Sequence, residues 1–88
     1  MKTVKISLNS IDKVKSFVNE ITKYDNDFDL VSGRYVVDFD LVSGRYVIDA
    51  KSIMGIFSLD LSKPIDLNIH ADNDIDTILA VLKPYIVE

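Results

Sequence analysis

Residues 27–37 read DFDLVSGRYVV, and residues 38–48 repeat them as DFDLVSGRYVI. Only the last position differs, Val37 against Ile48, so ten of the eleven positions match. Solenoid and propeller repeats are longer, at about 20–50 residues, and occur at least three times. One second copy that is nearly identical to the first indicates a recent or a deliberate duplication. We favour deliberate engineering over a natural two-copy insertion.

Each copy has the pattern of a β-hairpin. Apolar residues alternate with aspartates, Ser-Gly forms a turn, and the alternation resumes after it. A two-residue turn pairs Val31 with Arg34, and Val42 with Arg45 in the second copy. Both hairpins would then use the same edge of the middle strand, because successive residues direct their backbone groups to opposite edges. We therefore expect the copies to compete for one place in the sheet, or to meet end to end, with two registers or a strand-swapped homodimer as the result.

The segments around the repeat predict two more strands and three helices. Alternating apolar residues predict a first strand over 4–8 and a last strand over 65–70. Apolar residues at helical spacing predict helices over 11–21, 53–59 and 75–82. Without one repeat copy the order is β-α-β-β-α-β-α, which favours an α+β open-faced sandwich with helices on one face of an antiparallel sheet.

Composition excludes several classes of function. The 88 residues have a net charge of −4 and no basic cluster, which argues against nucleic acid and anionic membranes as partners. The longest apolar run, residues 78–82, is far too short to span a membrane. Without cysteine there are no disulfides, so the cytoplasm is the expected location. A single histidine excludes His-based metal clusters, and we expect no metal and no cofactor.

Two stretches outside the repeat carry a family signature. Thr22-Lys23-Tyr24-Asp25 ends the first predicted helix, and residues 51–59 read KSIMGIFSL. With one repeat copy removed, the whole chain resembles HPr, the small phosphocarrier of the bacterial sugar phosphotransferase system. The resemblance implies a single HPr-like domain over residues 1–88, of fold βαββαβα with antiparallel sheet order 1423. The tandem repeat 27–37 / 38–48 would add one duplicated β-hairpin segment.

The chain departs from this family where the family does its chemistry. HPr carries its phosphoryl group on a histidine at the start of the first helix, inside an HARPA-like motif. Ser10 takes the position of that histidine here, and Asp12 that of the motif's arginine. Carrier chemistry needs an imidazole nucleophile and a nearby cation, so we expect no catalytic residue in this chain. His70 is expected to be a solvent-facing residue at a strand end and not a replacement.

The resemblance also implies a regulatory site. In the family, the serine equivalent to Ser52 is phosphorylated by a dedicated kinase, and the product helps a transcriptional repressor to sense sugar supply. A helix N-terminus at Ser52 would favour the phosphate, and Ser52 is in any case a helix N-cap. In the family, Ile53, Met54 and Phe57 belong to an exposed apolar patch that docks partner proteins. Core packing explains these three residues about as well.

These observations leave two functional interpretations. The first is a non-catalytic HPr-like protein carrying an engineered strand duplication that probes register exchange or strand swapping. The alternative is a natural HPr-like regulatory protein that acts through phosphorylation of Ser52. The partners implied are a kinase, a transcriptional repressor, or a second copy of the chain in a strand-exchanged homodimer.

Overall fold

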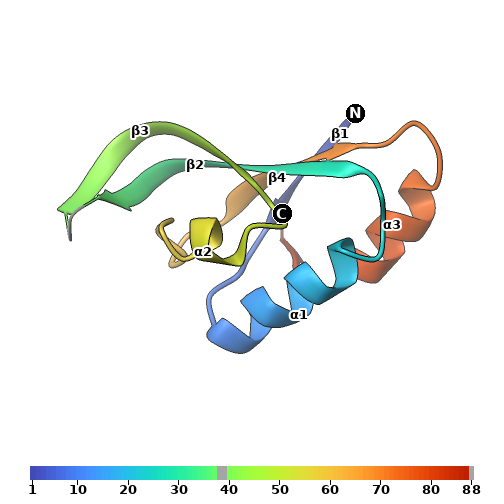
Figure 1. Ribbon diagram of the computed structural model, residues 1–88, viewed down its shortest axis with the longest axis horizontal. Coiled ribbons are helices and arrows are strands. Elements are labelled where there is room, and N and C mark those ends of the chain that lie inside the picture. The colour runs from blue at the N-terminus through green and yellow to red at the C-terminus, as the bar shows by residue number, and fades with distance from the viewer. Residues whose placement is uncertain (38–39, 88) are drawn as a thin grey trace.

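The computed structural model describes residues 1–37 and 40–87, with side chains described for 1–33 and 45–87. Within these residues the chain forms five strands and three helices (Figure 1). In chain order they are β1 (Lys2–Ile6), α1 (Ile11–Ile21), β2 (Asp27–Val37), β3 (Asp40–Asp49), α2 (Ile53–Ile56), β4 (Ile65–His70), α3 (Ile75–Leu82) and β5 (Ile86–Val87).

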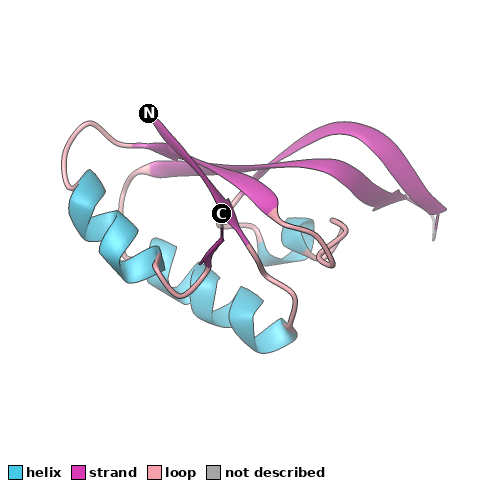
Figure 2. Ribbon diagram, turned by 180° about the vertical axis from the view of Figure 1, so that it is seen from behind, coloured by secondary structure: helices cyan, strands magenta, loops and turns pink. Residues whose placement is uncertain are grey.

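The strands form one antiparallel sheet, and the helices cover one of its faces (Figure 2). The described strands follow the order β3-β2-β4-β1-β5. The predicted α+β class is therefore confirmed: the molecule is a small α+β fold with an open sheet. β5 was not expected. It pairs with the end of β1, where Ile86 faces Ile6, and it is too short to leave an alternating pattern in the sequence.

The core forms between the helices and the inner face of the sheet. Alternate residues of β2 and β4 turn inward and are fully buried, as the period of two requires. From α1, Val14, Phe17 and Ile21 pack against them. The ring of Phe17 meets the ring of Tyr85 edge to face, with centroids 5.7 Å apart. The predicted stripe of α1 is thus confirmed except at Ile11, which lies in the first turn and is 61% exposed.

The predicted pair of separate hairpins is wrong. The first repeat copy forms β2 and the second supplies nearly all of β3, so the two copies pair with each other in one long hairpin. Val31 pairs with Val47 and not with Arg34, while Arg34 pairs with Ser43. Neither Ser-Gly segment is a turn, because both lie inside strands. The copies therefore do not compete for one place in the sheet.

This arrangement keeps both ends of the hairpin where a single copy would put them. Asp27 still follows the end of α1, and Asp49 still leads into α2. The added residues form four further cross-strand pairs, from Arg34 with Ser43 to Val37 with Asp40. A looped-out copy would lose these pairs and would also have to close a loop. The hairpin therefore absorbs the duplication at its tip. Its origin by engineering stays a prediction.

The lengthened hairpin extends beyond the rest of the sheet. β2 pairs with β4 only from Asp27 to Val31, so residues 34–37 and 40–43 form a two-stranded extension, which we call the ribbon (Figure 1). At the base of the ribbon, two successive cross-strand pairs are Ser32 with Tyr46 and Arg34 with Ser43. Between these pairs β2 has one residue, Gly33, whereas β3 has two, Gly44 and Arg45. This two-against-one count is a β-bulge. The molecule extends 39 Å along its longest axis against 24 Å along the other two.

Candidate functional site

Ser10 is the N-cap of α1. Its backbone is extended, and its Oγ accepts a hydrogen bond from the backbone N–H of Lys13 at 3.2 Å. Asp12 follows in the first turn, where a carboxylate complements the positive end of the helix dipole. Both side chains are exposed. The position that the resemblance to HPr aligns with a phosphohistidine thus holds a helix-capping hydroxyl with an acidic neighbour.

Ser10→Ala is expected to lower the free energy of unfolding by about 1 kcal/mol, because the N–H of Lys13 loses its acceptor. Ser10→Asp should retain most of the stability, since aspartate also caps helices. Urea unfolding followed by circular dichroism measures both effects. Asn9→Ala is the matched control, since Asn9 is an exposed neighbour outside the helix. Equal losses for the Ser10→Ala and Asn9→Ala variants would contradict a capping role.

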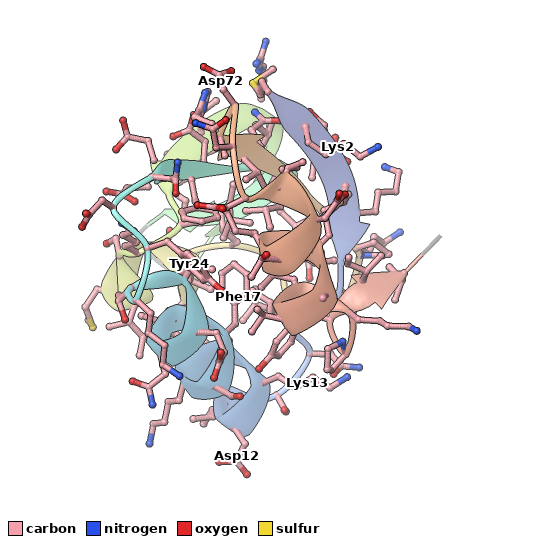
Figure 3. All side chains as sticks on the ribbon, turned by 90° about the vertical axis from the view of Figure 1, so that its right-hand side faces the viewer. Lys2, Asp12, Lys13, Phe17, Tyr24 and Asp72 are labelled. Carbon is pink, nitrogen blue, oxygen red and sulfur yellow. The ribbon has the colours of Figure 1, made fainter. Side chains whose placement is uncertain are left out.

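His70 lies at the other end of the molecule from Ser10. β4 ends at His70, beside the start of β1, where Lys2 faces Ile69, whereas Ser10 follows the end of β1. β1 alone separates these ends by about 13 Å. Figure 3 shows Lys2 at one end and Asp12 and Lys13 of the first turn of α1 at the other. The imidazole therefore does not reach the α1 N-terminus.

The histidine is nevertheless not isolated. It is exposed, as expected, but its Nε2 lies 2.6 Å from Oδ2 of Asp29 on the neighbouring strand β2. Together with Asp27 and Asp49 this pair lines an open hollow of about 380 Å³ on the sheet. Within the described residues no group of three or more His, Asp or Glu side chains has the geometry of a metal site. No local sequence pattern predicts this pair, because its members are 41 positions apart.

Ser52 caps α2 in the same way that Ser10 caps α1. Its Oγ accepts a hydrogen bond from the backbone N–H of Gly55 at 3.2 Å, and the residue is exposed. The glycine makes this close approach possible, since a Cβ at position 55 would lie 3.1 Å from Ser52 Oγ and 3.3 Å from Cδ1 of Ile48. The predicted capping role of Ser52 is confirmed. α2 itself is a single turn, Ile53–Ile56, shorter than the expected helix.

Lys51 fixes the segment that carries Ser52. Its Nζ donates a hydrogen bond of 2.7 Å to the backbone carbonyl of Tyr24 and lies 5.6 Å from the ring centroid of Phe28. Its backbone N–H donates to Oδ1 of Asp49 at 2.9 Å. The start of α2 is therefore held to the end of β3, to the β2 core and to the chain that follows α1.

The three residues of the predicted docking patch divide into two kinds. Ile53 is half-buried and packs against the core. Met54 is 78% exposed and Phe57 is 40% exposed, although both are large and apolar. Helical spacing alone could not separate the buried from the exposed residues of this segment. A helix of only four residues is too short for the spacing of its apolar residues to define one buried face. We refer to Ser52, Met54 and Phe57 as the α2 surface.

No protein-family model, curated protein or solved structure gives a significant match to this chain. Along the described residues, no helix has both the length and the apolar character needed to cross a membrane.

Proposed function

We propose that the chain is a non-catalytic, HPr-like regulatory protein in which Ser52 accepts a phosphoryl group and the α2 surface docks a protein partner. The observation that carries this proposal is that Ser52 and two large apolar residues of the same short segment, Met54 and Phe57, are all exposed, and that the segment is anchored by Lys51. The strands β1, β4, β2 and β3 are neighbours in that order, which supports an HPr-like fold.

The residues at the N-terminus of α1 support a regulatory role for the chain rather than a phosphocarrier role. Ser10 has no imidazole, its hydroxyl caps the helix, and Asp12 places a negative charge where a transferred phosphate would need a cation. The one histidine of the chain, His70, is remote from this position and pairs with Asp29. Phosphohistidine transfer at the start of α1 has no nucleophile in this arrangement.

A phosphate on Ser52 would change the α2 surface in charge more than in shape. The modification adds nearly two negative charges and three strong acceptor oxygens next to Met54 and Phe57. A partner with an apolar pocket for these two side chains and a basic group opposite Ser52 would bind the modified chain more tightly. A kinase and a transcriptional repressor of the type that act on HPr are the partners this chemistry suits.

Incubation with an HPr-type serine kinase and ATP is expected to place one phosphoryl group on the chain, at Ser52. Ser52→Ala should abolish the modification, whereas Ser58→Ala should leave it unchanged. Ser58 is the matched control because it lies six residues on and its hydroxyl is directed to the carbonyl of Gly55. Intact mass and peptide mapping give the stoichiometry and position. No phosphorylation, or phosphate only at another residue, would contradict the proposal.

A further inference from the structure

We propose that two copies of the chain form a dimer by exchanging halves at the tip of the hairpin. Residues 1–37 of each molecule would then fold with residues 40–87 of the other. β2 would run on into β3 as one long strand, and the two long strands would cross as an antiparallel pair. The proposal is independent of the phosphorylation of Ser52, because it rests on the register of β2 and β3 and on the residues that join them.

The register of the hairpin is compatible with a two-fold axis. In the ribbon the partners run from Arg34 with Ser43 to Val37 with Asp40. The same register, continued between two molecules, places Asp38 of one opposite Phe39 of the other. Every pair that β2 makes with β3 within one chain can therefore also be made between chains, with two pairs added at the axis. Exchange of identical elements in this way is a low-cost route to a dimer.

The residues at the tip favour a strand over a tight turn. The pair Val37 with Asp40 leaves two residues of the sequence between β2 and β3, Asp38 and Phe39, which lie outside the described residues. Two-residue hairpin turns need positive φ angles and therefore prefer Asn-Gly, Asp-Gly or Gly-Xaa. Phenylalanine is disfavoured at positive φ but is favoured in strands. In the exchanged dimer these two residues are ordinary strand residues, so the requirement for a turn disappears.

Neither glycine of the repeat relieves this requirement. Gly33 and Gly44 are the residues best suited to a turn, but the register places both inside strands at the bulge. Simple edge-to-edge association through β3, the edge strand of the described sheet, is the competing arrangement. It would not involve Asp38 and Phe39, so it gains nothing from the preference of phenylalanine for strands.

A disulfide across β1 and β4 distinguishes these arrangements. Thr3 faces Asn68, and Thr3 Oγ1 donates a hydrogen bond of 2.8 Å to Oδ1 of Asn68, so cysteines at these positions are within reach of each other. The chain has no other cysteine. In the exchanged dimer Thr3 lies beside Asn68 of the partner subunit. Oxidised Thr3→Cys/Asn68→Cys protein, refolded at high concentration, should therefore run as a covalent dimer on non-reducing gels.

A dimer whose cysteines link only within each chain would overturn half-exchange in favour of edge pairing. A strictly monomeric mass after refolding at every concentration would overturn it as well. A second variant tests the turn chemistry directly: Asp38→Asn/Phe39→Gly supplies a favoured two-residue turn and should reduce the dimer fraction by about tenfold or more. An unchanged dimer fraction in this variant would show that the tip does not drive the exchange.

Discussion

Leu30→Ala is expected to lower the free energy of unfolding by about 2–5 kcal/mol, whereas Leu41→Ala should cost less than about 1 kcal/mol. The two leucines occupy the same position of the repeat, within the identical sequence DLVSG. Leu30 is fully buried and faces Leu67 of β4. Leu41 pairs with Val36 in the ribbon, beyond the last pair between β2 and β4. The local sequence is matched, so the difference reports on position in the fold alone.

Urea unfolding followed by circular dichroism gives both values, and the slope of the transition shows whether unfolding remains cooperative. A shift of the chain by one repeat would bring Leu41 into the place of Leu30. In that case the two substitutions would have similar effects, because each variant could use the intact copy in the sheet. Similar losses for the two variants would therefore contradict the register described for β2 and β4.

Phe17→Ala is expected to lower the free energy of unfolding by about 3–5 kcal/mol, because it opens a cavity between α1 and the sheet. Phe17 lies in the interior of the molecule (Figure 3), and its ring is fully buried. The substitution also removes its edge-to-face contact with the ring of Tyr85. Small domains have total stabilities of about 5–15 kcal/mol, so this one change removes a large part of the total. Thermal and urea unfolding of the variant measure the loss.

Phe57→Ala is the matched comparison, with the same atoms removed from the α2 surface. Phe57 is 40% exposed, so we expect a loss of stability of about 1 kcal/mol or less. Its main effect should be weaker binding of the proposed protein partner to the chain phosphorylated at Ser52. A loss of stability as large as that of Phe17→Ala would show that Phe57 belongs to the core and would contradict its assignment to a docking surface.

Local signals in the sequence were sufficient to locate the helices and the first and last of the predicted strands. Ser10 and Ser52 each stand directly before the first apolar residue of a predicted helix, and each is the N-cap of that helix. The alternation around Leu67 predicted β4. These features depend on neighbours within a few residues, so a single sequence contains the information needed for them.

The strand pairing within the hairpin could not be predicted from such local signals. Ser-Gly is a local turn signal, but the pairing that prevails joins Val31 to Val47 and is decided by how the ends of the hairpin meet α1 and α2. β5 depends on a partner, Ile6, that is far away in the sequence. At the candidate site, the resemblance identified Ser52, but the exposure of Phe57 and the contact of His70 with Asp29 arise only from tertiary packing.

The narrow space between Ser52 and Gly55 has a spectroscopic consequence. The amide proton of Gly55 is directed to the hydroxyl oxygen that any acyl or phosphoryl donor would have to reach. Esterification of that oxygen changes the acceptor seen by this proton, so the chemical shift of one glycine amide becomes an internal reporter of the chemical state of the serine. Glycine amides resonate in a sparsely populated region, and with three glycines in the chain the signal can be assigned and followed in real time.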